Sequence, residues 1–173
     1  MTPAARLQAA IEILDEVIVS ARDDGSPADS IVTRYFKTRR YAGSKDRRAV
    51  RELVFRAIRA VAERPVSGRA AVLALVENDP SLRDLFGEPR GPELIADTET
   101  VAERGTVPSW LGAEMSPLVA VEEWLALLER APLDLRVNVA RTSREEILAQ
   151  FEGAQATRLS PWGIRLPADS RVA

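Results

Sequence analysis

The chain has 173 residues, of which 46% are hydrophobic, and its formal net charge is −2 at pH 7. This length and composition suit one domain or slightly more, with a real core rather than a disordered chain. The sequence contains no cysteine and no histidine, which excludes thiol nucleophiles, histidine acid–base chemistry, disulfides and Cys/His zinc sites. No apolar run approaches the length of a membrane span, and acids interrupt the first apolar stretch, unlike a signal peptide. We therefore expect a cytoplasmic protein with no membrane partner.

The N-terminal part predicts three successive helices. Apolar residues recur at i, i+3 and i+4 spacing over residues 3–21, which is typical of one amphipathic helix. Ser26 and Pro27 indicate the start of a second helix, with Ser26 as its N-cap. We expect Ser44 to cap a third helix that runs to about Val61.

The middle of the chain is acidic and mostly helical by pattern. Residues 67–131 hold five basic and twelve acidic residues. We expect helices at 67–77 and 117–130, separated by loop-like segments that contain several prolines. Trp110 and Trp124 stand in apolar helical contexts, so both are predicted to lie in the core.

The pattern changes after Pro132, where a β-rich segment is predicted. Residues 133–139 alternate apolar and polar side chains, as a half-buried strand does. Ser143 and Glu146 fit a capping box at a helix start, and short strands are expected at 156–160 and 163–166. A β-α-β start with so few elements cannot form a stable sheet alone, which predicts truncation or completion by a partner.

These elements predict a mainly α fold. A helical bundle occupies residues 1–131, and a small, incomplete α/β segment occupies 132–173. Arg136 and Asn138 share the polar side of the first strand, which fits either a solvated face or a contact with RNA or another domain. Trp162 stands in a Pro-Trp-Gly turn and is expected to pack over the small strands.

The stretch 34–59 concentrates positive charge within an otherwise acidic chain. It holds ten lysines and arginines, only two acids and four aromatic residues. A solvated charged face is the simplest interpretation of such a run. A basic surface with aromatic side chains is also what phosphate binding combined with base stacking requires.

Two details favour RNA binding over simple solvation. Arg47 and Arg48 stand in the first turn of the third helix, where the helix dipole disfavours a cation by roughly 0.3–1 kcal/mol. A helix N-terminus flanked by arginines is a suitable phosphate cradle. At 100° per residue, Phe55 is expected to point outward beside Arg48, Arg51 and Arg59, on the side opposite the apolar stripe.

A resemblance supports this interpretation. RYFKTRRYAGSKDRRAVRELVFRAIR at 34–59 resembles the second and third helices of the NusB-like domain of bacterial ribosomal RNA cytosine-C5 methyltransferases of the Fmu/RsmB type. VPSWL at 107–111 and PLDLRVN at 132–138 match landmarks of that family in the same order, and SREEILAQF and LSPWGIRL resemble the next segments of its members. The resemblance covers nearly the whole chain through the order and spacing of these motifs.

The resemblance implies an N-terminal helical RNA-binding domain, a small α/β connecting subdomain and then a Rossmann-like catalytic domain. In the family that last domain binds S-adenosylmethionine and carries the cysteines that attack cytosine. Because this sequence contains no cysteine, we expect it to be inactive alone. It would be the N-terminal region of such an enzyme, with ribosomal RNA and its own C-terminal methyltransferase domain as partners.

We therefore predict no catalytic residue, no metal site and no cofactor bound by this chain itself, S-adenosylmethionine being implied only for the parent enzyme. The expected RNA-binding residues are the cations and exposed aromatics of the basic stretch: Arg39, Arg40, Tyr41, Lys45, Arg47, Arg48, Arg51, Phe55 and Arg59. Two alternatives remain open. One is a helical protein–protein adaptor of the NusB type, whose basic face meets an acidic protein surface, and the other is a self-standing enzyme of unknown type.

Overall fold

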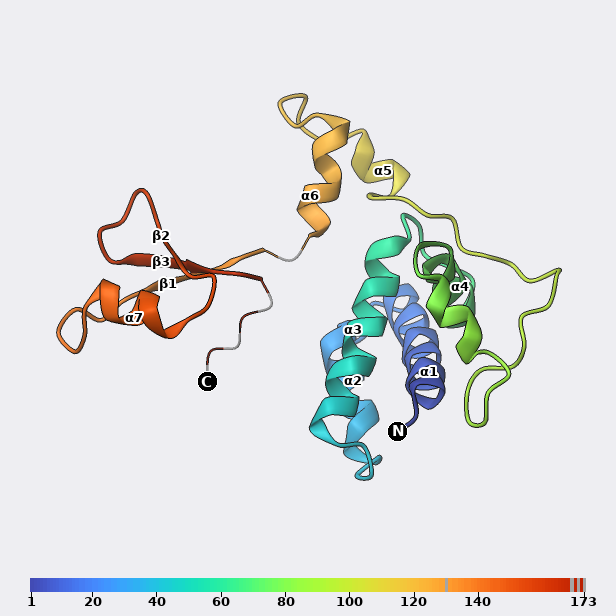
Figure 1. Cartoon of the computed structure of the whole chain (residues 1–173). Helices are drawn as coiled ribbons and strands as arrows, with labels where there is room; N and C mark the ends of the chain where they lie inside the picture. Colours follow the sequence, from blue (N-terminus) through green and yellow to red (C-terminus); the bar gives the residue numbers. More distant parts are fainter. Residues whose placement is uncertain (130, 169, 171, 173) are drawn as a thin grey trace. The chain divides into compact units, whose positions relative to one another are not determined.

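A computed structural model describes residues 1–129, 131–168, 170 and 172. It divides the chain into two compact units, Met1–Leu125 and Ala126–Ala173, and each unit is described here by itself. The predicted fold class is confirmed, because helices dominate the chain and a small three-stranded sheet comes after them (Figure 1).

Four helices build the core of the first unit (Figure 1): α1 (Pro3–Arg22), α2 (Ala28–Lys37), α3 (Ser44–Ala60) and α4 (Gly68–Asn78). Helix α1 packs against each of the other three. Its apolar stripe includes Leu7, Ile13 and Leu14, which are fully buried together with Val54 of α3 and Val72 of α4. Helix α1 therefore forms the centre around which the basic α2–α3 segment is held.

Helix ends follow local capping chemistry, with two corrections to the expected caps. The side chains of Thr2 and Ser67 accept hydrogen bonds from backbone amides and cap α1 and α4. The prediction for Ser26 was wrong, because Pro27 holds the cap position of α2. The prediction for Ser44 was also wrong, because Gly43 holds the cap position of α3 and Ser44 is its first helical residue.

The segment after α4 contains shorter helical elements than the sequence predicts. It contains the 3-10 helix η1 (Pro80–Leu85), α5 (Ser109–Gly112), the 3-10 helix η2 (Val121–Glu123) and α6 (Trp124–Leu128). The single helix expected at 117–130 was wrong. Ala120 has an extended backbone, and its amide donates a hydrogen bond to the Glu123 carboxylate. Helical structure therefore begins only after Ala120, at Val121. Residue 130 lies outside the described residues.

The two tryptophans of this segment differ in burial. Trp110 is 68% exposed, so its predicted place in the core was wrong. It stands in a helix of four residues, which is too short to present a continuous apolar face to the bundle. Trp124 is partly buried, and its ring lies against Gly112.

The second unit holds β1 (Leu133–Arg136), α7 (Arg144–Gln150), β2 (Gln155–Ala156) and β3 (Gly163–Leu166). The strands form an antiparallel sheet in the order β1-β3-β2, with Leu135 opposite Ile164. The predicted capping box of Ser143 and Glu146 is confirmed at the start of α7.

Two of the expected strands are shorter than the sequence pattern predicts. The strand expected at 133–139 ends at Arg136, because Asn138 begins a turn in which its side chain accepts a hydrogen bond from the Ala140 amide. The strand expected at 156–160 is limited to Gln155–Ala156. The small core of this unit contains Val137, Ile164 and Leu166, covered in part by Ile147 and Phe151. No helix among the described residues is long and apolar enough to traverse a lipid bilayer.

Candidate nucleic-acid interface

The turn between α2 and α3 presents the first part of the basic stretch. Helix α2 ends at Lys37, and the Ala42 amide then donates to the Arg39 carbonyl, which closes a tight turn. Ala42 is buried, whereas the Tyr41 side chain is 72% exposed and Arg40 is also exposed. The buried Ala42 thus anchors a turn whose Arg40 and Tyr41 side chains face solvent.

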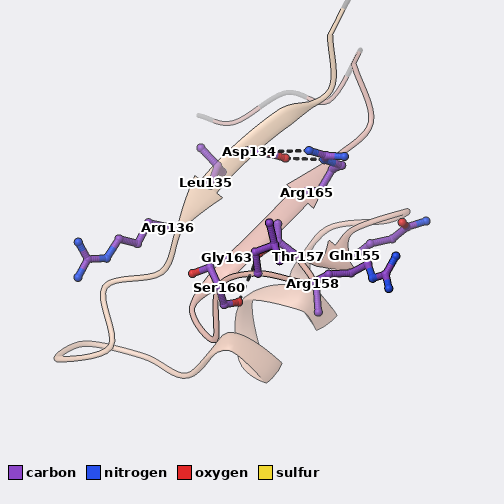
Figure 2. Close-up of a pocket in the computed structure, with 11 residues that line it drawn as sticks. Asp134, Leu135, Arg136, Gln155, Thr157, Arg158, Ser160, Gly163 and Arg165 are labelled. Atoms are coloured by element: carbon purple, nitrogen blue, oxygen red, sulfur yellow. Dashed lines mark hydrogen bonds and ion pairs between the residues drawn. The ribbon is translucent and has the colours of Figure 1, made fainter.

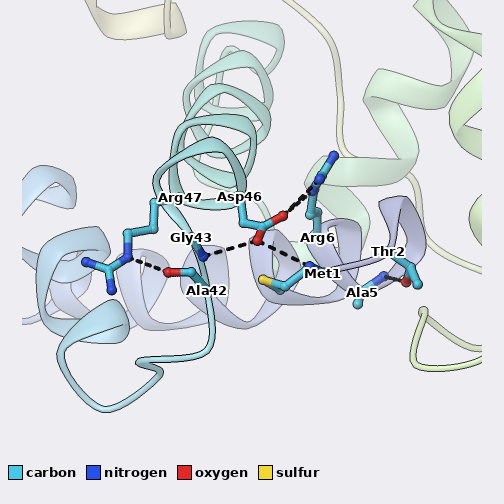
Figure 3. A network of polar contacts seen from close by, with 8 residues as sticks. All are labelled: Met1, Thr2, Ala5, Arg6, Ala42, Gly43, Asp46 and Arg47. Atoms are coloured by element: carbon cyan, nitrogen blue, oxygen red, sulfur yellow. Dashed lines mark hydrogen bonds and ion pairs between the residues drawn. The ribbon is translucent and has the colours of Figure 1, made fainter.

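A carboxylate occupies the N-terminus of α3. Asp46 Oδ2 accepts a hydrogen bond from the Gly43 amide at 3.2 Å, and its oxygens also bind the Met1 ammonium and the Arg6 guanidinium (Figure 3). These contacts, the hydrogen bond from Arg6 first, lower the pKa of Asp46 below its ordinary value. The Gly43 amide at this helix N-terminus is therefore already bonded to a carboxylate of the chain itself, and the negative charge of Asp46 disfavours a phosphate beside it.

Arg47 extends to the other side of this first turn (Figure 3). Its Nε donates to the Ala42 carbonyl at 2.9 Å, and its guanidinium lies 5.8 Å from the ring centroid of Phe36. These contacts orient the guanidinium over the turn. They leave its remaining donors available, and the side chain is exposed.

The predicted cations fall into two groups. Arg39, Arg51 and Arg59 already pair with carboxylates of this chain, at 3.5 Å to Glu12, 2.6 Å to Asp29 and 3.5 Å to Glu52 respectively. Among the residues that the structure describes, no ion pair forms at Arg40, Lys45, Arg47 or Arg48, and all four are exposed. We call these four residues the 40–48 cluster.

The remaining predicted residue lies farther along α3. Phe55 is partly buried rather than fully exposed, and the Arg51 guanidinium lies 5.4 Å from its ring centroid. Part of its ring surface is therefore covered by protein. Tyr41 is the more accessible of the two aromatic side chains expected to stack on a base.

A cavity that the sequence patterns did not predict lies beside the same turn. Most of its lining residues belong to α1 and α2 or to the turn that follows α2, and we call it the α1–α2 cavity. The α1–α2 cavity has a volume of about 510 Å³, within the roughly 300–1,000 Å³ typical of ligand sites. Its polar lining includes Gln8, Glu12, Tyr35, Arg39, Tyr41 and Arg90. Only Arg39 and Tyr41 belong to the predicted set. The others come from α1, α2 and the loop after η1, so they are too far apart in the sequence for a local motif to predict that they lie together.

The second unit has a larger, more open depression of about 920 Å³ over its sheet. Arg165 pairs through two hydrogen bonds with Asp134 across the strands, which neutralises its charge. Arg136 points away from Arg158 (Figure 2) and lies 5.3 Å from the Trp162 ring centroid. The arginines of this depression therefore do not converge on one point, unlike an anion site.

No metal site can be assigned, because the described residues contain no cluster of three or more Asp, Glu, His or Cys side chains placed to hold an ion.

Comparison with family models, curated proteins and solved structures finds no match to this chain. Any functional interpretation therefore depends on the basic surface itself and on the cavity beside it.

Proposed function

We propose that this chain binds RNA, with the 40–48 cluster as its main phosphate contact. The observation that carries the proposal is the set of four exposed cations on one turn and the adjoining start of α3, none of them paired with a carboxylate among the described residues. Exposed cations that are not paired with a carboxylate of the chain keep their positive charge available for phosphate, and counterion release then drives association.

The charge distribution favours one binding face over a general affinity for polyanions. The whole chain is slightly acidic at −2, although the stretch 34–59 has ten basic and two acidic residues. Acidic residues elsewhere repel phosphate and limit the orientations in which RNA can approach. The bound RNA would thus lie along the α2–α3 turn.

The resemblance of the sequence to ribosomal RNA cytosine-C5 methyltransferases extends the proposal. In that case the RNA is ribosomal, and the chain holds it so that a domain using S-adenosylmethionine reaches one cytosine. The absence of cysteine in this sequence means that the covalent attack on cytosine used by that family needs residues outside it. Incubation with labelled S-adenosylmethionine and ribosomal RNA should give no methyl transfer, and any transfer would contradict this part of the proposal.

Charge reversal tests the binding face. The double variant Arg40→Glu/Arg48→Glu should lose most of the affinity for an RNA oligonucleotide, measured by fluorescence anisotropy at fixed salt. A matched control, Arg64→Glu/Arg83→Glu, changes the net charge equally at two other exposed arginines. Equal affinities of the two double variants would contradict the proposed face.

A second candidate is a helical adaptor whose basic face meets an acidic protein surface. The pairing of Arg39, Arg51 and Arg59 with carboxylates of the same chain favours it, because such pairs show that this face accommodates carboxylates. The same double variants distinguish the two candidates. An adaptor predicts weak, sequence-independent RNA binding that the Arg40→Glu/Arg48→Glu change affects no more than the control does.

A further inference from the structure

The α1–α2 cavity has an ordered polar wall. The Tyr35 hydroxyl donates to Glu12 Oε2 at 2.6 Å, and the Arg39 guanidinium lies 3.5 Å from the Tyr35 ring centroid while donating to the Tyr35 carbonyl. Burial, together with the hydrogen bond to Glu12, raises the pKa of Tyr35 above its ordinary value, so the hydroxyl remains a donor at neutral pH. This arrangement holds the Glu12 carboxylate in one position.

The same wall presents hydrogen-bond acceptors to the cavity. Gln8 Nε2 donates to Glu12 Oε1 at 3.2 Å, and only the amide nitrogen can donate to a carboxylate, so the orientation of the Gln8 amide is determined. Among the described residues, the Gln8 carbonyl oxygen has no donor. Glu12 Oε1 can accept a further bond, since a carboxylate oxygen has two lone pairs and the Glu12 side chain is 43% exposed. Each of these two lining side chains therefore retains an oxygen that can accept a hydrogen bond from a ligand.

The rim supplies an aromatic ring and cations. Tyr41, which lines the cavity, is 72% exposed, and it comes directly after Arg40 of the 40–48 cluster in the chain. Arg90, also in the lining, has φ 66°, the left-handed region that arginine rarely adopts. Such a backbone conformation at a cavity is often found at ligand sites.

We propose that this cavity holds one unpaired guanine of the bound RNA. The inference rests on the proposed function, because the 40–48 cluster would hold the neighbouring phosphates. Guanine presents two adjacent donors on its Watson–Crick edge, N1–H and the N2 amino group, which would donate to the Glu12 and Gln8 oxygens. Its O6 accepts from a guanidinium of Arg39 or Arg90, and its ring stacks on Tyr41. The other bases present fewer donors to this pair of acceptors.

Four hairpin RNAs that differ only in one bulged nucleotide test the proposal with the full chain. By fluorescence anisotropy, the bulged guanine should bind roughly tenfold more tightly than adenine, cytosine or uracil, the discrimination expected of one well-placed pair of hydrogen bonds. Glu12→Gln, which retains an acceptor for Tyr35, should abolish this preference. Tyr41→Ala should weaken the guanine hairpin by about tenfold, whereas Tyr41→Phe should restore its binding.

Arg48→Ala is the matched control, because it lies outside the cavity lining and should weaken all four hairpins equally. Equal binding of the four hairpins by the unchanged protein, with normal salt dependence, would overturn the guanine site alone. A guanine preference that persists in Glu12→Gln would overturn it as well. If none of the hairpins binds, the proposed RNA-binding function itself fails. If guanosine monophosphate competes at the same concentration as the hairpin, the ligand is the free nucleotide and not RNA.

Discussion

Arg6 and Asp46, forty positions apart in the chain, form an ion pair at 2.8 Å that ties the first turn of α1 to the first turn of α3. Asp46 at the same time accepts a hydrogen bond from the Gly43 amide. The carboxylate thus fixes the start of the basic helix and supplies the negative charge that its dipole favours there. The negative charge of Asp46 offsets the unfavourable interaction of the nearby Arg47 and Arg48 with the helix dipole.

The contacts of Asp46 make the stability of the protein dependent on pH. Its pKa is lowered in the folded state, so its contribution is present above the ordinary aspartate pKa and is lost as the pH falls through the folded-state value. Asp46→Asn should therefore unfold at a temperature several degrees lower at pH 7, measured by circular dichroism. The two proteins should converge in strong acid. Asp84→Asn, an exposed carboxylate in η1, serves as the control and should change little.

Glu99 provides a second pH-dependent contact. The Arg69 guanidinium and the Ala96 amide lower the pKa of Glu99 to about 2, from an ordinary value of 4.5. Its stabilising effect should be complete above pH 4.5 and disappear as the pH falls toward 2. Glu99→Gln should thus lower the unfolding temperature at pH 7 but not at pH 2. A constant difference at both pH values would show that charge pairing is not the cause.

Gly68 marks the closest approach of α4 to α1. A Cβ atom there would overlap the Ile11 carbonyl and stand 2.8 Å from the Leu14 Cβ. Gly68→Ala should therefore destabilise the protein by about 1–3 kcal/mol, as overpacking does. Gly112→Ala is the control, because its new Cβ would meet only ordinary contacts, 3.6 Å from Trp124 at the nearest. Urea unfolding measures both, and equal stabilities would contradict the close packing described.

The structural features that were predicted correctly are those that depend on short-range patterns in the sequence. Apolar spacing located α1, α3 and α4, because a buried helical stripe repeats every three or four residues. The capping box of Ser143 and Glu146 was found for the same reason, since its two residues interact across one turn. Trp110 was misplaced because an apolar context does not determine whether a short helix reaches the core.

The candidate site was predictable only in part. Charge clustering identified the basic stretch, but the pattern could not distinguish Arg48, which is unpaired among the described residues, from Arg51, which pairs with Asp29 twenty-two residues away. Glu12 and Arg90 escaped detection because they join the cavity only through tertiary packing. The ion pair of Asp46 with Arg6 was missed for the same reason, because Arg6 is distant in the sequence, whereas the contact of Asp46 with Gly43 spans only three residues.

The salt dependence of RNA affinity tests the central claim most directly. For single-stranded RNA, the slope of log K against log salt should be about −0.7 for each phosphate neutralised. The triple variant Arg40→Ala/Lys45→Ala/Arg48→Ala should therefore have a slope shallower by about 2 than that of the unchanged protein. Arg22→Ala/Arg64→Ala/Arg83→Ala, with the same loss of charge, should leave the slope unchanged. Identical slopes for the unchanged protein and the first triple variant would contradict the account.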